Sequence, residues 1–138
     1  MTDVHSKEIR SFNMSKIRSK DTKPEMLVRQ FLHKNGFRYK LHVKDMPGKP
    51  DIVLPKYKTV ILVHGCFWHG HEGCKLFKMP KTRTEWWKNK IGRNYTNYLI
   101  AKAKLQESGY KVLTIWECEL VKSKRIETLD RLSSQVIR

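Results

Sequence analysis

The spacing of apolar and polar residues divides the chain into helices and strands. Apolar residues recur every three or four positions, as in a helix that buries one face, in three segments: residues 22–35, 84–107 and 123–137. Alternating or continuous apolar runs rich in β-branched residues predict four strands: residues 37–43, 51–54, 59–64 and 110–117. Gly36 ends the first helix, and Gly92 is a position at which the long second helix could break.

The order of these elements predicts an α/β domain. The run at 59–64 is almost entirely apolar, which is typical of a strand in the centre of a sheet. The helix over 84–107 connects it to the strand at 110–117, and a helical crossover of this length suits a parallel pair. With 138 residues the chain has room for one hydrophobic core. We therefore expect a three-layer α/β core, with a mixed sheet flanked by helices.

The first 20 residues differ in composition from the rest of the chain. Residues 1–20 are polar and basic, and their few apolar side chains, among them Met14 and Ile17, are too few to form a core. We expect a basic arm that is loose until it meets a partner, followed by a single domain over residues 21–138.

The chain starts without an apolar signal segment, and no apolar run approaches the ~20 residues of a membrane span. We therefore expect an intracellular protein that is not embedded in a membrane.

The charge of the chain predicts a polyanionic partner. Lys and Arg number 29 against 13 Asp and Glu, which gives a formal net charge of +16. The basic residues are spread along the whole chain and interleave with four Trp and five Tyr. A merely soluble basic surface and an anionic membrane are the alternatives, but an amphipathic basic helix of the kind that binds membranes is not apparent. Nucleic acid is therefore the favoured partner.

The cysteines predict a metal site. Three cysteines, in a chain without an export signal, disfavour disulfides. Zinc takes four nitrogen or sulfur ligands in a tetrahedron. Cys66, Cys74 and one of His69 and His71 could supply three of them, and Cys118 could be the fourth, because Cys66 and Cys118 each follow one of two strands expected to be parallel neighbours. The alternative is a set of buried thiols beside an unrelated His-rich loop, but exposed loops rarely bury free thiols. Four protein ligands would make the site structural.

A second set of residues could carry nuclease chemistry. Asp51 stands between a turn and a strand, where one carboxylate can hold Mg²⁺ against a phosphate. His64 and His69, at and beyond the end of the next strand, could activate water or protonate a leaving oxygen. Glu25 could hold a water beside the metal. Three of the four have a simpler explanation: Asp51 as a turn residue, Glu25 in a capping box with Thr22, and His64 as a hydrogen-bonded histidine at a sheet edge.

Four blocks of the chain resemble the very short patch repair (Vsr) endonucleases. They are residues 15–25, 47–51, 64–69 and 116–118, within a resemblance that runs from about Phe12 to Glu119. The resemblance implies the fold of the restriction-endonuclease superfamily. It also implies Mg²⁺-dependent cleavage of duplex DNA on the 5′ side of the mismatched T in a T:G pair, the lesion left when 5-methylcytosine deaminates.

The resemblance also implies roles for individual residues. Asp51 and the main-chain carbonyl of Val63 would ligate Mg²⁺, Glu25 and His64 would orient waters around it, and His69 would be the acid/base residue nearest the scissile phosphate. The implied ligands of a structural Zn²⁺ are Cys66, His71, Cys74 and Cys118.

Aromatic and apolar side chains are implied to contact the DNA. By the resemblance, Phe67, Trp68 and Trp87 would push into the base stack at the mismatch, and Met14 and Ile17 on the arm would enter the minor groove. A T:G pair costs less to unstack than a Watson–Crick pair, so wedges of this kind select for it. The alternative is that these aromatics are core residues. Because Trp86 and Trp87 are adjacent and cannot face one way on a helix, at least one should be exposed.

One departure from the family pattern concerns the metal site. Tyr98 stands where the resemblance leads one to expect an aspartate, and residues 86–106 contain no acidic residue. One alternative function is therefore a zinc-stabilised protein that binds mismatched or distorted DNA with weak or no cleavage. Another is a restriction-type endonuclease with a different target.

The resemblance also suggests partners and a location. A MutL-type repair protein or a cytosine methyltransferase would be a partner, and the protein would act in the bacterial cytoplasm, at the nucleoid. The chain shows no heptad repeat, so we expect a monomer.

Overall fold

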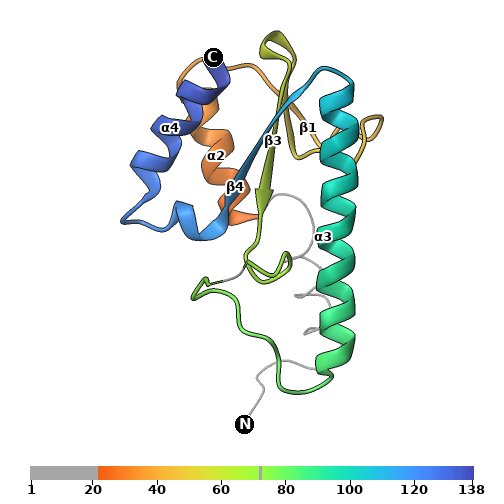
Figure 1. Cartoon of the computed structure of the whole chain (residues 1–138). Coiled ribbons are helices and arrows are strands. Elements are labelled where there is room, and N and C mark those ends of the chain that lie inside the picture. Colours follow the sequence, from red (N-terminus) through yellow and green to blue (C-terminus); the bar gives the residue numbers. More distant parts are fainter. Residues whose placement is uncertain (1–21, 72) are drawn as a thin grey trace, which may run out of the picture.

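The computed structural model describes residues 22–71 and 73–138 (Figure 1). The helices are α2 (Lys23–Lys34), α3 (Thr84–Glu107) and α4 (Arg125–Ile137), and the short 3₁₀ helices are η1 (Pro55–Tyr57) and η2 (Glu117–Leu120). The strands are β1 (Lys40–Leu41), β2 (Ile52–Leu54), β3 (Thr59–His64) and β4 (Lys111–Trp116). The predicted arm over residues 1–20, with Met14 and Ile17, lies outside the described residues.

The strands form one mixed sheet in the order β1-β2-β3-β4. β1 and β2, and β2 and β3, pair antiparallel, whereas β3 and β4 run parallel over their whole length, from Thr59↔Lys111 to His64↔Trp116. The predictions that 59–64 is an inner strand and that 110–117 is parallel to it are confirmed. His64 and Trp116 therefore end neighbouring strands at the same edge of the sheet.

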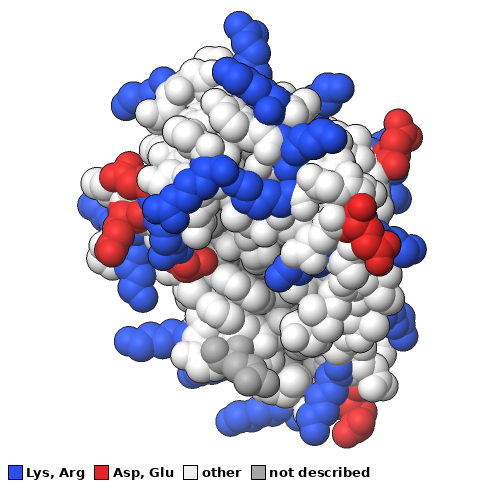
Figure 2. Space-filling view, turned by 45° about the horizontal axis from the view of Figure 1, so that its top comes forward, with Lys and Arg blue, Asp and Glu red and all other residues white. Residues whose placement is uncertain are grey.

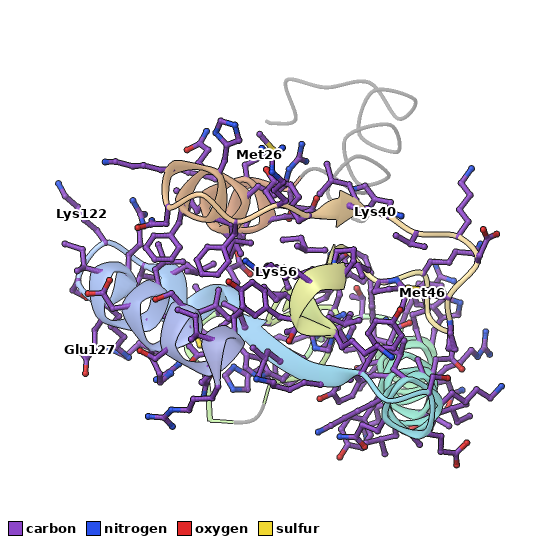
Figure 3. All side chains as sticks on the ribbon, turned by 90° about the horizontal axis from the view of Figure 1, so that it is seen from above. Met26, Lys40, Met46, Lys56, Lys122 and Glu127 are labelled. Carbon is purple, nitrogen blue, oxygen red and sulfur yellow. The ribbon has the colours of Figure 1, made fainter. Side chains whose placement is uncertain are left out.

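Helices cover both faces of the sheet, which confirms the predicted three-layer α/β core. Seen from above, α2 and α4 lie on one side of the sheet and α3 lies on the other (Figure 3). The strand residues sort by alternation: Ile52 and Ile61 pack in a core with residues of α2 and α4, and Val53 and Val60 pack in a second cluster with Leu105 of α3. Side chains that point the same way as Val60, including His64, therefore face α3.

One prediction about element bounds is wrong, and the question of a break at Gly92, which the sequence left open, is answered. The strand predicted over 37–43 is reduced to β1, because His42 adopts a left-handed backbone conformation (φ 48°) that ends the extended run. The helix over 84–107 is continuous through Gly92, which is exposed on its surface. A glycine inside a helix costs about 1 kcal/mol relative to alanine, an amount that a helix of this length packed on a sheet tolerates.

The first helix begins as predicted, but its cap is only half of the expected capping box. The Thr22 hydroxyl accepts a hydrogen bond from the Glu25 amide at 3.4 Å, as an N-cap does. The Glu25 carboxylate, however, contacts Arg29 and His42.

Among the described residues, no helix is long and apolar enough to cross a membrane.

Candidate active site and metal centres

A cleft of about 1210 Å³ opens between α3, the N-terminus of α2 and the ends of β2 and β3. The four residues predicted to carry catalysis all line it: Glu25, Asp51, His64 and His69. Lys23, Lys49 and Lys90 also line the cleft. Residues from four separate parts of the sequence are thus brought to one concave, basic surface.

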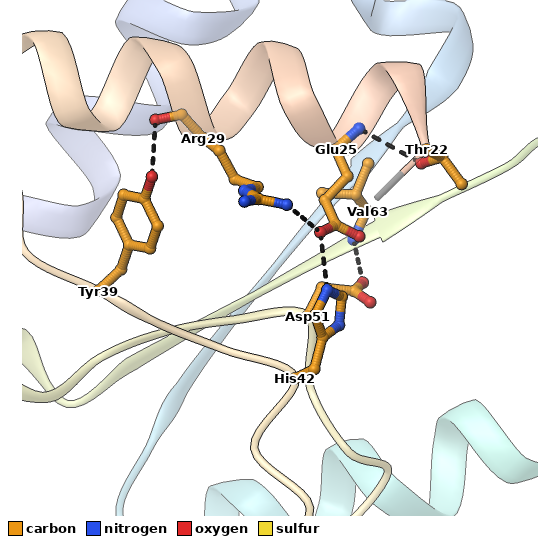
Figure 4. A network of polar contacts seen from close by, with 7 residues as sticks. All are labelled: Thr22, Glu25, Arg29, Tyr39, His42, Asp51 and Val63. Carbon is orange, nitrogen blue, oxygen red and sulfur yellow. Dashed lines mark hydrogen bonds and ion pairs between the residues drawn. The ribbon is translucent and has the colours of Figure 1, made fainter. Parts of the chain in front are cut away.

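Glu25, His42 and Asp51 come together, with His42 and Asp51 below the Glu25 carboxylate in the view of Figure 4. His42 Nε2 lies 3.0 Å from Glu25 Oε2, and the Arg29 guanidinium lies 3.3 Å from the same oxygen. One ligand atom from each of Glu25, His42 and Asp51 lies within 4.8 Å of the others, so the three could hold a metal ion. Glu25 is almost fully buried, at 2% exposure, and its position depends on these two contacts.

Asp51 is held by the backbone of β3. The Val63 amide donates a hydrogen bond to Asp51 Oδ2 at 3.0 Å. Burial raises the pKa of Asp51 to about 6, with a smaller rise from the nearby Glu25 carboxylate, and the Val63 hydrogen bond and His42 partly oppose this. The nearby Glu25 carboxylate thus disfavours the charged form of Asp51. A bound cation would relieve that repulsion, so the donor set fits a divalent metal.

His42 is a functional candidate that the sequence pattern missed. Alternation places it with Lys40 on the polar side of the predicted strand. Its left-handed backbone instead turns the imidazole toward Glu25, while its amide donates to the Asp51 carbonyl at 3.0 Å. The only available signal was weak: histidine is among the residues that tolerate positive φ, and it stands just before a turn.

His64 and His69 form a stacked pair. Their ring centroids are 3.7 Å apart and their planes differ by 3°. Burial lowers the pKa of His64 to about 3, with a further contribution from His69, and burial lowers the pKa of His69 to about 4. Both imidazoles are therefore uncharged near neutral pH. The Nδ1 atoms of both rings are buried and lack a hydrogen-bond partner within the described residues.

Tyr98 faces this histidine pair from α3. Its ring meets the His64 ring edge-on, with centroids 4.7 Å apart, and its hydroxyl lies 3.1 Å from Thr114 Oγ1. The structure therefore places an uncharged phenol, fixed by a hydrogen bond to β4, against His64.

The three cysteines and His71 converge beyond the ends of β3 and β4. One ligand atom from each of Cys66, His71, Cys74 and Cys118 lies within 4.8 Å of the others. In a tetrahedral zinc site with Zn–S bonds of about 2.3 Å, sulfur atoms stand ~3.8 Å apart, so this spacing fits. Cys118 Sγ lies 3.4 Å from His71 Nδ1, and burial raises the pKa of the Cys66 thiol. Of the two candidate histidines, His71 joins the thiols and His69 joins His64.

Trp116 lies between the thiol cluster and the stacked histidine pair. Its ring stacks on His71, with centroids 4.0 Å apart and planes 10° from parallel, and its edge packs against His64 at 5.2 Å. The pairing of His64 with Trp116 in the parallel ladder produces this contact.

The predicted intercalating residues form one aromatic cluster. The ring centroid of Phe67 lies 5.1 Å from those of both Trp68 and Trp87, and the centroids of the two tryptophan rings lie 5.6 Å apart. All three are half-buried, and Phe67 and Trp68 line the cleft. The Asn94 side chain donates to the Trp68 carbonyl at 2.8 Å and so ties this loop to α3. Trp86 is 44% exposed, as its adjacency to Trp87 predicts.

Most of the charged side chains on the surface are basic. Figure 2 shows many Lys and Arg on one face and few Asp and Glu, in keeping with the formal charge of +16. A surface of this charge attracts polyanions over long distances and releases counterions when it binds them.

Known proteins with similar sequences are nucleases. The family model for DNA mismatch endonuclease Vsr matches residues 2–75. The type II nicking enzyme V.NmeAIP of Neisseria meningitidis is 49% identical over 138 residues, 99% of this chain and 97% of that protein. The type II nicking enzyme V.XorIIP of Xanthomonas oryzae is 48% identical over 87% of this chain and 88% of that protein.

A further relative carries the name of the family. The DNA mismatch endonuclease Vsr of Escherichia coli (strain K12) is 45% identical over 120 residues, 87% of this chain and 76% of that protein. Similarity of this extent covers both clusters of candidate ligands. This chain is therefore a DNA endonuclease with a restriction-endonuclease-like fold, and it belongs to the Vsr family.

Proposed function

We propose that this protein is a Mg²⁺-dependent repair endonuclease that nicks duplex DNA on the 5′ side of the mismatched T in a T:G pair. The observation that carries the proposal is the meeting of Asp51, Glu25 and the stacked His64–His69 pair in one basic cleft beside an aromatic cluster. The names of the relatives, a mismatch endonuclease and nicking enzymes, support it.

Asp51 and the main-chain carbonyl of Val63 would hold the magnesium ion. Once bound, Mg²⁺ would supply positive charge against the scissile phosphate. Glu25 would hold water near the ion, with its carboxylate oriented by His42 and Arg29. His64, at the end of β3, would be the second group that orients water there.

His69 would move the proton. Because its pKa is lowered to about 4, the imidazole is unprotonated near neutral pH and can accept a proton from the attacking water. The oxygen of that water forms the new bond to phosphorus as the bond to the leaving oxygen breaks. Lys23, Lys49 and Lys90 at the cleft would hold the flanking phosphates.

The aromatic cluster would select the mismatch. Phe67, Trp68 and Trp87 present half-buried rings beside the cleft, and rings in that position can enter a base step. Because a T:G pair stacks less firmly than a Watson–Crick pair, the cost of insertion is lowest there. Met14 and Ile17 would enter the minor groove from the arm over residues 1–20.

The four-ligand cluster would be a structural zinc site. Cys66, His71, Cys74 and Cys118 would complete a tetrahedron without an open position, which is the arrangement of structural zinc. Bound zinc would pin the loop that carries Phe67 and Trp68 to the end of β4.

A nicking assay tests the function. Purified protein is incubated with one end-labelled duplex carrying a central T:G pair, and with its T:A and C:G counterparts, with and without Mg²⁺. We expect a single nick on the 5′ side of the mismatched T, which is absent from the matched duplexes and when Mg²⁺ is omitted. Cleavage of matched duplexes would instead indicate a restriction-type enzyme.

A second candidate function is mismatch binding with little or no cleavage. The observation that favours it is Tyr98, an uncharged side chain against His64. Tight, T:G-selective binding without a nick in the same assay would establish this function.

The proposal includes a setting for the enzyme. A single nick requires one active site, so we propose a monomer that acts in the bacterial cytoplasm at the nucleoid. A MutL-type repair protein would be its partner.

A further inference from the structure

The orientation of the His64 ring depends on aromatic contacts. Its Nδ1 atom is buried and lacks a hydrogen-bond partner within residues 22–71 and 73–138. His69 stacks on one face, and two rings meet it edge-on: Trp116 at 5.2 Å and 83°, and Tyr98 at 4.7 Å and 79°. Edge-to-face contacts of this kind are directional, because the positive edge of one ring meets the negative face of another.

Tyr98, the edge-on neighbour that α3 contributes, is anchored by a side-chain hydrogen bond. Its hydroxyl and Thr114 Oγ1 lie 3.1 Å apart, and this bond joins α3 to β4. Thr114 pairs with Leu62 in the parallel ladder, two residues before the His64↔Trp116 pair. β3, which carries His64, is therefore linked through Thr114 of β4 to the Tyr98 ring. That ring limits the rotation of the His64 imidazole.

We propose that Tyr98 is a positioning residue of the nuclease site: its ring, held by Thr114, keeps the His64 imidazole in the stack with His69. The proposal rests on the proposed function, since it gives His64 a role in cleavage. The contact that joins Tyr98 to the candidate catalytic residues is the one with the His64 ring, so its effect passes through His64.

The competing explanation is that Tyr98 only fills the core. It packs against the cluster of Val53, Val60, Leu62 and Leu105, so its removal could simply loosen α3. The two explanations differ in what the hydroxyl does. A purely space-filling role needs the ring alone, whereas a positioning role also needs the bond to Thr114.

The first test uses variants that keep the core filled. Tyr98→Phe and Thr114→Val each remove one partner of the hydrogen bond, and Thr114→Ser, which keeps a hydroxyl, is the matched control. We expect single-turnover nicking of the T:G duplex to fall roughly threefold in each of the first two, with DNA affinity unchanged. The double variant should be no slower than either single one, because both break the same bond. Thr114→Ser should match the wild type.

The second test removes the ring. Tyr98→Leu should slow single-turnover nicking roughly tenfold, the effect expected for loss of a directed aromatic contact. Leu99→Ala, at the next position of the same helix and at a side chain that is 45% exposed, is the control and should stay within about twofold of the wild type. Equal losses in both would show a general effect on α3 and overturn the proposal.

A measurement on the DNA-free protein separates this proposal from the proposed function. In ¹⁵N-histidine-labelled protein, the ring signals of His64 should move in Tyr98→Phe and Thr114→Val and stay in place in Thr114→Ser. If these signals move but wild-type protein does not nick, the positioning holds and the nuclease function fails. If wild-type protein nicks and neither the signals nor the rate change in Tyr98→Phe and Thr114→Val, the positioning proposal is overturned.

Discussion

Two clusters of candidate metal ligands lie near the same edge of the sheet, and they differ in every property that decides what a metal does. Cys66, His71, Cys74 and Cys118 offer four sulfur and nitrogen donors, enough to enclose an ion completely. Glu25 and Asp51 offer two carboxylates on the wall of a cleft, His42 adds one imidazole, and the three leave coordination positions open. The four sulfur and nitrogen donors suit a structural zinc ion that stabilises the fold. The carboxylate-containing set suits a hard divalent cation that contacts substrate.

The difference also lies in how each cluster is held. The thiol cluster joins a loop to η2 through contacts 52 residues apart in sequence, such as the Cys118 amide to Cys66 Sγ. The carboxylate cluster is built by hydrogen bonds between α2, the segment after β1, and β3 (Figure 4). Loss of the first should therefore unfold a region, whereas loss of the second should stop chemistry in a folded protein.

The largest effect is expected from the thiol cluster. Cys118→Ala should lose zinc and most of the stability of the loop and η2, because structural zinc is worth roughly 10–16 kcal/mol of apparent binding energy in small peptides. Zinc content and thermal denaturation measure this. His33→Ala, at an exposed histidine on α2, is the control and should keep both. A Cys118→Ala protein with full zinc content would remove Cys118 from the ligand set.

The carboxylate cluster should show the opposite behaviour. Asp51→Ala should reduce nicking by roughly 10³-fold or more, because it removes the main ligand of the catalytic ion. Zinc content, melting temperature and affinity for the T:G duplex should change little. Asp45→Ala, at an exposed aspartate six residues earlier, is the matched control. Substantial nicking by Asp51→Ala would show that another group holds the metal.

His42 should act through Glu25. His42→Ala should slow nicking by roughly 10- to 100-fold, the usual cost of losing a group that orients a ligand. Asn tolerates the left-handed backbone at this position, so His42→Asn separates the imidazole from the backbone conformation. Steady-state kinetics at several Mg²⁺ concentrations should show both variants needing more Mg²⁺. If His42→Asn behaves as the wild type, the imidazole has no role.

The pKa of Asp51 predicts how pH affects metal use. Since that pKa is about 6 in the metal-free protein, protons compete with Mg²⁺ below pH 6. The Mg²⁺ concentration for half-maximal nicking should rise roughly tenfold between pH 7 and pH 5, since the ionised fraction of Asp51 falls by about that factor. A Mg²⁺ requirement independent of pH over this range would contradict Asp51 as the ligand.

The smallest effect concerns how the stability of the Mg²⁺-free protein depends on pH. The pKa values of His64 and His69 are lowered to about 3 and 4, so both favour folding above their usual pKa of 6.5 and lose that contribution as pH falls toward 4. The raised pKa of Asp51 acts the other way, because its contribution is complete below pH 3.8 and is lost as pH rises through 6. Two histidines outweigh one carboxyl, so zinc-loaded protein without Mg²⁺ should melt at lower temperature at pH 5 than at pH 7. A higher melting temperature at pH 5 would contradict the neutral state of the two histidines.

Much of the architecture follows from local pattern. The apolar run at 59–64 predicted the central strand, and the helix at 84–107 predicted a parallel crossover; the structure confirms both. The convergence of Cys66 and Cys118 could be expected from the same topology, because parallel neighbours end at one edge. The choice between His69 and His71 could not, since both lie in one loop and spacing allows either.

By itself the sequence determined the order of elements, a mixed sheet flanked by helices, the basic charge and the family, because hydrophobic periodicity and motif spacing are local properties of the chain. Tertiary structure decided which side chains act together. The left-handed turn at His42 reversed the alternation that placed it with Lys40, and it brought the imidazole to Glu25. The bond between Tyr98 and Thr114 likewise depends on how α3 packs across β4. Contacts of this kind depend on distances between distant segments, which no local pattern encodes.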